Sequence, residues 1–405
     1  MSVSSQSQQK QPDVGEVLQT IATEGDAYLQ KDEKSRKRLL EAAQSLTLAL
    51  ETPSEAVNRI CWAAPTQLSV ARVAVDLKIF EKLSEDGGTP KTTAQLATAT
   101  GADPALIGRV LKHLASVRLI AEIAADTYGP NHLTKVFCEP KYRDGISFCF
   151  DLAGPPFQRL PEYLAKNGYK DPTDVADGPF QYGHRTELNS WGFMKANPQI
   201  RSSFNNHMSG YAFGRPHWMD PGFYPVEENL IQGFKDSKDA VMIVDVGGGL
   251  GHDLELFYEG YPKAPGRLIN QDIPDTIGSI AKSKYDIEHE VHDFYTPQPI
   301  KGARAYYLHS VLHDWGDENA LKILQQLVPA LEKGYSKILI NENVIPDTGA
   351  SWEMTSLDFY MMGLAASRER TESQWRKLLD SAGLKAVKIW FHERASESLI
   401  EAELE

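Results

Sequence analysis

Residues 244–251 read Val-Asp-Val-Gly-Gly-Gly-Leu-Gly, and this stretch decides the fold of the second half of the chain. It extends an apolar run, and an apolar helical pattern begins shortly after it at Leu254. A buried strand, a glycine-rich turn and a helix form the opening unit of a nucleotide-binding α/β domain. Gly247 and Gly249 have no Cβ atom, so the turn can bring its backbone close to a ligand.

Acidic residues follow two later strands of the predicted sheet. Residues 267–272 read as a strand that ends in Asp272, which is placed to accept hydrogen bonds from ribose hydroxyls. Asp293 and Phe294 follow a third segment and are suited to accept from an adenine amine and to pack on its ring. Either acid alone could be an ordinary loop carboxylate. The two acids together, each at the end of a strand that follows the glycine turn, favour a nucleoside site.

The glycine spacing separates two kinds of nucleoside ligand. The dehydrogenase pattern Gly-x-Gly-x-x-Gly clamps a pyrophosphate on a helix N-terminus. Here the third glycine is missing, and Asp253 would place negative charge beside that pyrophosphate. The cluster that runs from Asp245 through Gly247 and Gly249 to Gly251 instead resembles motif I of class I S-adenosylmethionine-dependent methyltransferases. The ligand of those enzymes carries no phosphate, so an acidic pocket is tolerable.

Composition restricts the class of protein. The chain has 405 residues, of which 41% are hydrophobic, and a net charge of −13. That charge disfavours nucleic acid or an anionic membrane as the main partner. No apolar run reaches the ~18 residues of a membrane helix, and we expect a cytoplasmic enzyme. The three cysteines, Cys61, Cys138 and Cys149, lack a CxxC pair, which argues against a disulfide framework and a thiolate metal site.

The first part of the chain is predicted to be an interaction domain. Residues 1–12 are rich in serine and glutamine and read as a disordered tail. Residues 13–150 are predicted to form a mainly helical, winged-helix domain. Within it, residues 65–80 read as one strongly apolar helix that needs a partner surface, which suggests a homodimer.

A helix-turn-helix pattern lies inside this first domain. Thr92 and Asp103 are suited to cap its two helices, and residues 122–128 and 129–134 suggest a two-stranded wing. The second helix carries a modest basic set, so a DNA-binding winged helix is one alternative. We favour the interpretation that these basic residues form a solvated helix face, because the whole chain is acidic.

Residues 151–235 are predicted to be a helical linker region that contributes to a substrate pocket. The stretch is rich in aromatic residues and methionine, which suits either core packing or an apolar pocket for a flat substrate. The candidate substrate-binding residues, here and later in the chain, are Met194, Met208, Trp315, Tyr360, Met361 and Leu364.

Three separated segments supply a candidate catalytic group. His313 follows a strand-like run, Glu342 ends the predicted strand 337–342, and Glu369 precedes a predicted helix at 372–381. Ligands of open α/β sheets bind beyond the carboxyl ends of the strands. One carboxylate can accept from the histidine Nδ1–H and stabilise the cation, while the other aligns the ring.

At this point the second half of the chain resembles the plant caffeic acid O-methyltransferases and their fungal secondary-metabolite relatives. The resemblance implies that His313 is the general base and that Glu342 and Glu369 flank it. It also implies that Gly247, Gly249, Asp272, Asp293 and Phe294 bind the cofactor. The family has lysine four residues before the base, but this chain has His309 there, so a cofactor-edge contact is altered. The matching stretches are 244–251, 271–277, 292–294, 312–317, 341–346 and 368–371.

The resemblance implies an α/β fold with two parts. Residues 236–405 are expected to form a Rossmann-like methyltransferase domain with a mostly parallel seven-stranded sheet, preceded by the winged-helix dimerisation domain. The expected reaction is S-adenosylmethionine-dependent methylation of a hydroxyl, phenolic by preference, on an aromatic polyketide or related metabolite, without a metal. The alternative is a pericyclase or dehydratase of the same fold, in which S-adenosylmethionine is a non-reacting electrostatic cofactor.

Overall fold

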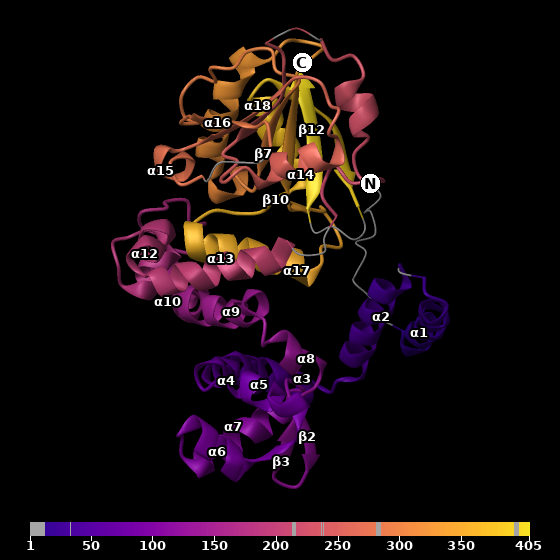
Figure 1. Ribbon diagram of the computed structural model, residues 1–405, viewed down its shortest axis with the longest axis vertical. Helices are drawn as coiled ribbons and strands as arrows, with labels where there is room; N and C mark the ends of the chain where they lie inside the picture. The colour runs from indigo at the N-terminus through magenta and orange to yellow at the C-terminus, as the bar shows by residue number, and fades with distance from the viewer. Residues whose placement is uncertain are drawn as a thin grey trace, which may run out of the picture. The chain divides into compact units, whose positions relative to one another are not determined.

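The computed structural model describes residues 13–32, 34–212, 216–235, 237, 239–280, 285–392 and 397–405 (Figure 1). The predicted tail at residues 1–12 lies outside the described residues. The chain divides into two compact units, Met1–Glu139 and Pro140–Glu405. Residues 151–235, which the sequence set apart as a linker region, fall within the second unit. No helix among the described residues is long and apolar enough to cross a membrane.

The first unit contains a helix-turn-helix and a small antiparallel sheet, whose strand β1 precedes the helix-turn-helix and whose strands β2 and β3 follow it. Thr92 and Gln95 form a capping box at the start of the first helix, and Asp103 caps the second by accepting from the Leu106 N–H. The sheet has the strand order β1-β3-β2. The helices of this unit are α1 Val14–Leu29, α2 Ser35–Leu50, α3 Pro53–Asn58, α4 Ala64–Asp76, α5 Ile79–Ser84, α6 Thr93–Thr100, α7 Pro104–Ser116 and α8 His132–Val136, and the strands are β1 Lys91–Thr92, β2 Ala121–Ala124 and β3 Thr127–Gly129.

Two element predictions for this unit were wrong. The apolar helix expected over 65–80 is two helices, because Lys78 adopts a left-handed conformation with φ of 54° between α4 and α5. The wing expected as strands over 122–128 and 129–134 lies earlier in the chain, because β2 is Ala121–Ala124 and β3 is Thr127–Gly129. Asn131 then caps α8 by accepting from the Thr134 N–H at 3.0 Å, and this local hydrogen bond competes with strand pairing.

The second unit opens with helices and continues as an α/β domain. The opening helices are α9 Pro140–Phe148, α10 Gly154–Lys166, α11 Pro179–His184, α12 Ser190–Ala196 and α13 Pro198–Ala212. The later helices are α14 His252–Gly260, α15 Pro274–Ile277, α16 Asp317–Leu327, α17 Trp352–Ala365 and α18 Glu372–Ser381. Thr371 and Gln374 form a capping box at the start of α18, which confirms the helix cap predicted at Thr371.

The described residues form a seven-stranded sheet in the order β11-β12-β8-β7-β4-β5-β6. The five strands from β8 to β6 in this order are parallel, and β12 and β11 pair antiparallel at one side. This architecture confirms the predicted Rossmann-like, mostly parallel fold. The strands are β4 Val241–Val246, β5 Arg267–Asp272, β6 Glu288–Val291, β7 Ala305–His309, β8 Lys337–Glu342, β11 Leu384–Phe391 and β12 Ser398–Leu404, and the short strands β9 Val344–Ile345 and β10 Arg370–Thr371 form a separate parallel pair.

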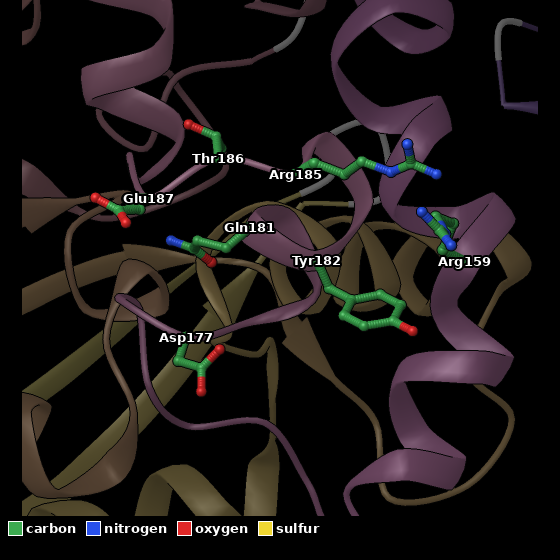
Figure 2. Close-up of a pocket in the computed structure, with 7 residues that line it drawn as sticks. All are labelled: Arg159, Asp177, Gln181, Tyr182, Arg185, Thr186 and Glu187. Carbon is green, nitrogen blue, oxygen red and sulfur yellow. The ribbon is translucent and has the colours of Figure 1, made fainter.

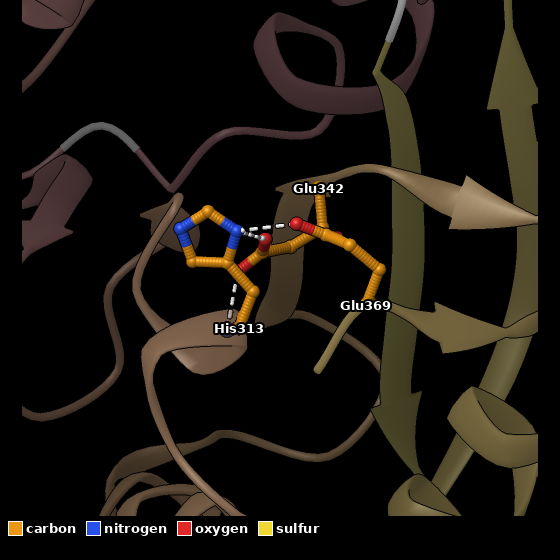
Figure 3. Close-up of side chains that lie close together, drawn as sticks. All are labelled: His313, Glu342 and Glu369. Carbon is orange, nitrogen blue, oxygen red and sulfur yellow. Dashed lines mark hydrogen bonds and ion pairs between the residues drawn. The ribbon is translucent and has the colours of Figure 1, made fainter. Parts of the chain in front are cut away.

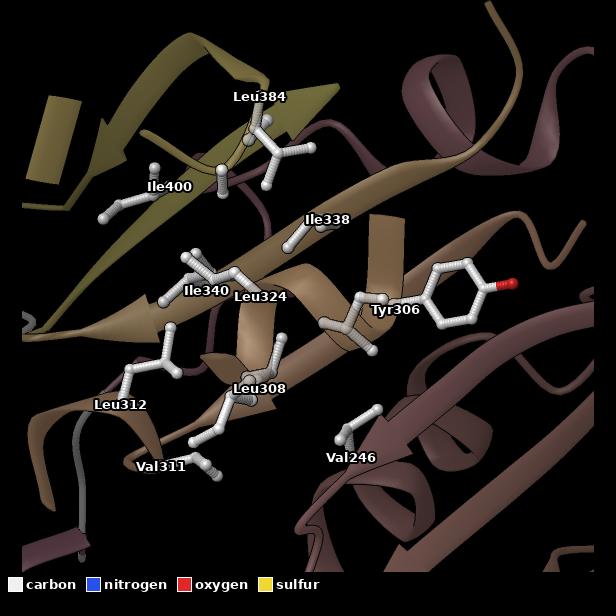
Figure 4. Close-up of a cluster of buried hydrophobic side chains, with 14 of the residues drawn as sticks. Val246, Tyr306, Leu308, Val311, Leu312, Leu324, Ile338, Ile340, Leu384 and Ile400 are labelled. Atoms are coloured by element: carbon white, nitrogen blue, oxygen red, sulfur yellow. The ribbon is translucent and has the colours of Figure 1, made fainter. Parts of the chain in front are cut away.

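The sheet is covered on both faces, which explains its continuous apolar strands. Residues of α16 and α18 pack on one face against Val246, Tyr306, Leu308 and Ile340 (Figure 4). Residues of α14 pack on the other face, where alternate strand residues point. The carboxyl ends of the parallel strands meet at one edge of the sheet, where the candidate site lies.

Candidate active site

The parallel strands bring the predicted catalytic residues together. His313 lies on a single 3-10 turn, Leu312–Asp314, three residues after β7 ends. Glu342 is the last residue of β8, which pairs with β7, and Glu369 directly precedes β10. Side chains from positions 56 residues apart thus meet at the edge of the sheet, as the sequence predicted.

One imidazole nitrogen of His313 faces both glutamates. Its Nδ1 lies 2.9 Å from Oε1 of Glu369 and 3.5 Å from Oε2 of Glu342 (Figure 3). The Nε2 edge of the ring points away from both carboxylates. Nε2 lies 3.8 Å from the Asp314 carboxylate, which is longer than a hydrogen bond. The ring is therefore held on its Nδ1 side and presents Nε2 as a proton acceptor.

Glu342 also fixes the backbone of the turn that carries the histidine. Its Oε1 accepts from the N–H groups of Val311, Leu312 and His313 at 3.1, 2.9 and 3.3 Å. The Glu342 side chain is fully buried. Three donors to one buried oxygen hold the turn and the carboxylate in a single arrangement, so the position of His313 is set before any ligand binds.

The buried cluster shifts the pKa values of its members. Burial opposes the charged ring of His313, but the carboxylates of Glu342 and Glu369 outweigh it and hold the pKa of His313 well above its usual value. Burial raises the pKa of Glu342 to about 7, against the attraction of His313. Each of these three side chains offers one atom that could bind a metal ion, and the three atoms lie within 4.8 Å of one another. In this structure a direct hydrogen bond joins His313 and Glu369.

Arg370 is a fully buried cation beside this cluster that the sequence did not single out. Its guanidinium donates to the carbonyl oxygens of Leu312 and Trp315 at 2.9 and 2.7 Å, and to Asp317 at 2.9 Å. It therefore ties both ends of the turn around His313 to β10. Its position directly after Glu369 was the available signal, but a lone arginine does not indicate burial.

His309 takes part in a second network, whose side chains are half-buried. Its Nδ1 lies 2.5 Å from Asp253 Oδ2 and its Nε2 lies 3.0 Å from Glu397 Oε2. Burial opposes the charged ring, but the two carboxylates hold the pKa of His309 well above its usual value. Asn341 donates to the same Glu397 oxygen at 3.1 Å. Both ring nitrogens thus have protein partners, and the predicted cofactor contact of His309 stays a prediction.

The glycine turn after β4 sits directly on buried polar side chains. A Cβ at Gly248 would lie 2.3 Å from Asn270 Oδ1 and 2.4 Å from the Asp245 carboxylate. Gly247 and Gly249 have φ values of 76° and 58°, the left-handed region that glycine tolerates. Asp245 is fully buried beneath the turn, and burial raises its pKa well above the usual range. Its direct contact with a cofactor stays a prediction.

Asp272 closes the other side of this turn. One carboxylate oxygen accepts from the Gly249 N–H at 2.9 Å and the other from the Ile273 N–H at 2.7 Å. Next along the edge, Asp293 accepts from the Tyr295 N–H at 2.9 Å. Phe294 meets Trp315 edge to face, with ring centroids 6.1 Å apart. Trp315, a predicted substrate residue, thus contacts a predicted cofactor residue.

Three predicted substrate residues belong to one apolar cluster. Met194 is buried among Phe148, Leu152 and Phe180, and Tyr360 and Leu364 pack against the same group. Tyr360 also meets Phe157 edge to face at 4.9 Å. Met361 is buried on α17 and Met208 is half-buried on α13. The cluster is rich in aromatic rings and suits a flat apolar ligand, although the same packing serves the core.

A separate surface cavity of about 450 Å³ opens at α10 and α11 (Figure 2). None of the predicted site residues lines it. The residues that line it are Arg159, Asp177, Gln181, Tyr182, Arg185, Thr186 and Glu187.

Comparison with known proteins agrees with this geometry. An O-methyltransferase domain model matches residues 224–385, and an O-methyltransferase dimerisation domain model matches residues 67–140. The O-methyltransferase mpaG of Penicillium brevicompactum is 38% identical over 390 residues, which cover 96% of this chain and 98% of that protein.

Solved structures give the same picture. A structure described as a pericyclic reaction enzyme is 29% identical, with a TM-score of 0.83, and covers 97% of this chain and 100% of that one. LepI in complex with S-adenosylmethionine is 30% identical with the same TM-score and coverage.

The fold and the strand-end site define a class of cofactor-dependent α/β enzymes that bind a nucleoside at a glycine turn. Within that class, the chain belongs to the O-methyltransferase family. It is an S-adenosylmethionine-dependent O-methyltransferase, related to fungal enzymes of secondary metabolism.

The residues of the turn fit S-adenosylmethionine better than a dinucleotide. Asp253 and Asp272 flank the turn, and their charges would oppose a pyrophosphate at this position. A Cβ on Gly249 would meet no atom within 4 Å, so the turn is open to a ligand on this side.

Proposed function

We propose that this enzyme methylates a phenolic hydroxyl of an aromatic polyketide or a related secondary metabolite, with His313 as the general base. The observation that carries the proposal is that both Glu369 and Glu342 contact Nδ1 of His313, so that Nε2 points away from the two carboxylates. A neutral ring held in this way accepts the phenolic proton at Nε2. The two carboxylates stabilise the cation that forms. Because a phenol has a pKa near ~10, a positioned base greatly increases the fraction of oxyanion.

The cofactor site is assigned to the residues that line the glycine turn. Bound S-adenosylmethionine supplies an electrophilic methyl group on a sulfonium, so the protein needs to provide only the oxyanion and its alignment. Gly247 and Gly249 form the turn, and Asp272 accepts from the ribose hydroxyls. Asp293 and Phe294 contact the adenine. The support is that all five residues lie at the carboxyl ends of neighbouring strands.

The acceptor is assigned to the apolar cluster of Met194, Tyr360 and Leu364. Methionine adapts to an irregular apolar surface, and aromatic side chains favour a flat ring. A phenol suits a site whose base is a single imidazole, because its oxyanion is far easier to form than that of an aliphatic alcohol. We propose in addition that the enzyme works as a homodimer, which the dimerisation-domain match at residues 67–140 supports.

One observation favours a second candidate function. The 29% identical structure is described as a pericyclic reaction enzyme, so the same fold hosts chemistry without methyl transfer. In that case His313 and its glutamates would act on an acceptor that keeps its hydroxyl unmethylated, or that loses water.

A labelled-methyl assay tests the proposal. Purified enzyme is mixed with methyl-deuterated S-adenosylmethionine and a panel of phenolic polyketides, and products are read by mass spectrometry. We expect a labelled methyl ether from the unmodified enzyme, and in His313→Ala a turnover lower by about 100-fold or more, the range for loss of a general base. Cofactor affinity, measured by calorimetry, should stay nearly unchanged in this variant. Full turnover in the variant, or unlabelled isomers as the sole products, would contradict the assignment.

A further inference from the structure

His309, the last residue of β7, contacts carboxylates of two other elements with its two ring nitrogens. Nδ1 lies 2.5 Å from Oδ2 of Asp253, the second residue of α14. Nε2 lies 3.0 Å from Oε2 of Glu397, which directly precedes β12. The three side chains are half-buried, and together they link β7, α14 and the start of β12. We call this set of two contacts the His309 link.

The geometry of the His309 link requires a positively charged ring. An ionised carboxylate only accepts hydrogen bonds, whereas a neutral imidazole has a single N–H donor. A neutral ring would therefore turn one unprotonated nitrogen toward a carboxylate, with lone pair against lone pair. Only the imidazolium donates at Nδ1 and Nε2 together, so loss of its proton breaks one of the two contacts.

Asp253 connects the His309 link to the glycine turn. It lies two residues after Gly251, which is the last glycine of the turn and the N-cap of α14. Its Oδ2 also accepts from the Tyr307 hydroxyl at 3.2 Å, and Tyr307, like His309, belongs to β7. The start of α14 is therefore fixed to β7 through one carboxylate.

The other side of the glycine turn is fixed to β5. Asn270 donates to the Gly249 carbonyl oxygen at 3.0 Å, and Asp272 accepts from the Gly249 N–H at 2.9 Å. The turn is thus held at its glycines by β5 and at its helical end by β7. Because Asp253 supplies the contact at the helical end, the position of the turn depends on the partner that Asp253 has in His309.

The Glu397 end of the link is fixed to β8. Asn341 donates to the same Oε2 of Glu397 at 3.1 Å, and Asn341 is the residue of β8 that pairs with His309 in the sheet. The carboxylate of Glu397 is thus held by two neighbouring strands, and it gives the ring a fixed partner on the side away from Asp253.

We propose that His309 is a positioning residue for the cofactor: its cationic ring joins Asp253 to Glu397 and so holds the glycine turn in the form that binds S-adenosylmethionine. This inference rests on the cofactor site proposed above. A binding site must keep its groups within about 0.5 Å of the productive geometry, so release of the start of α14 weakens binding without any direct contact between His309 and the cofactor. The plant family pattern has lysine at this position, and a positive charge is the property that the two residues share.

Histidine differs from lysine in that it can lose this charge near neutral pH. Burial opposes the charged ring, but Asp253 and Glu397 hold the pKa of His309 well above its usual value. The His309 link is therefore complete below this pKa and is lost as the pH rises through it. Affinity for the cofactor should fall with rising pH, a direction opposite to that of His313, which acts in its neutral form.

Other titratable groups surround the two contacts. Those that interact with the ring of His309 are Asp253, Glu397, Asp245, Glu342 and Tyr307, and those that act on its two carboxylates from farther away are His313 on Glu397 and His217 on Asp253. The carboxylates among them favour the charged ring, and the carboxylates of Asp253 and Glu397 are the two in hydrogen-bond contact with it.

Calorimetric titration with S-adenosylhomocysteine over a range of pH tests the inference without turnover. In the full-length chain we expect affinity to fall as the pH rises above ~6.5, the ordinary histidine value. His309→Gln cannot donate at both ends, so we expect its affinity at neutral pH to be weaker by about tenfold or more and to depend less on pH. His309→Lys stays charged to a pH near ~10, so we expect it to restore affinity to within about threefold and to remove the same part of the pH dependence. A merely structural loss would not be rescued by lysine.

His252→Gln is the matched control, because this histidine directly precedes Asp253 but is 75% exposed. It should keep both the affinity and its pH dependence. The α-amino group of the ligand titrates near ~8 and contributes equally to every variant, so the inference depends on the difference between variants. Undiminished affinity in His309→Gln, or the full pH dependence in that variant, would overturn the inference alone. Absence of binding by the unmodified chain would contradict the cofactor site itself, and the labelled-methyl assay tests methyl transfer separately.

The charge of the ring is measured directly by NMR of the full-length chain with carbon-13-labelled histidine. The signal of His309 is the one that is absent from His309→Gln and from His309→Lys. At a pH of ~7.5, where free histidine is about nine-tenths neutral, we expect the His309 signal to have the chemical shift of an imidazolium. A neutral ring at this pH would overturn the inference, because the two contacts could not then exist together.

Discussion

At the scale of single residues, the charges around His313 set the pH at which it can act as a base. The neutral ring is the active form. Since the carboxylates hold the pKa of His313 above its usual value, the ring stays protonated to a higher pH than free histidine. We therefore expect kcat/KM to rise with pH along a limb that lies above ~6.5, the ordinary histidine value.

The variant Glu369→Gln tests the cause of this limb. Removal of the charge that bonds Nδ1 at 2.9 Å lowers the pKa of His313, so the limb should move to lower pH. The maximal rate should fall by roughly tenfold or more, because the cation that forms loses its partner. Asp314→Asn is the matched comparison: that carboxylate also raises the pKa of His313, but it lies 3.8 Å from the ring without a hydrogen bond, so its loss should move the limb less. A limb that stays in place in Glu369→Gln would contradict this account.

The residues of the cluster differ in how far the sequence predicted them. His313 and Glu342 were predictable, because each lies at or after the end of a strand that periodicity indicates, and parallel strands end at one edge. Glu369 was marked by the helix predicted directly after it. The partners of His309 were not predictable from the sequence. Asp253 and Glu397 lie 56 and 88 residues away, and nothing local shows that two carboxylates converge on one ring.

At the scale of elements, Arg370 links the short strand β10 to the turn that carries the base. Replacement by lysine keeps the charge but cannot reach the Leu312 and Trp315 carbonyls and Asp317 together. We expect Arg370→Lys to lower the free energy of unfolding by about 2–4 kcal/mol. We also expect a fall in kcat, with cofactor affinity nearly unchanged.

Denaturant unfolding and calorimetry measure both effects. Arg376→Lys on α18 is the matched control, because that arginine is 46% exposed and pairs with an exposed glutamate. Such a surface pair is worth less than about 1 kcal/mol. If the two variants lost the same small stability and kept full kcat, Arg370 would not position the turn.

The elements themselves followed the sequence where caps and periodicity agreed. Thr92, Asp103 and Thr371 cap helices as predicted, since each precedes an apolar helical pattern. Lys78 and Asn131 broke two predictions. The left-handed conformation of Lys78 depends on the packing around it and has no signal in the sequence. Asn131 did offer a helix-cap signal, but the strand pattern around it was given more weight in the prediction.

At the scale of the whole molecule, every candidate catalytic and cofactor residue lies in the unit Pro140–Glu405. The first unit holds the dimerisation-domain match and contributes none of them. A ligand of the glycine turn should therefore stabilise the second unit by mass action and leave the intrinsic stability of the first unit unchanged.

Scanning calorimetry of the full chain tests this division. S-adenosylhomocysteine at about 100 times its Kd adds roughly 2.7 kcal/mol to the folded form that binds it. If the two units unfold separately, we expect the ligand to raise one transition and to leave the other in place. Asp272→Ala, which removes the acid predicted to bind the ribose, should reduce the shift. Equal shifts of two separate transitions would contradict this division of the chain, and an undiminished shift in Asp272→Ala would remove this residue from the cofactor site.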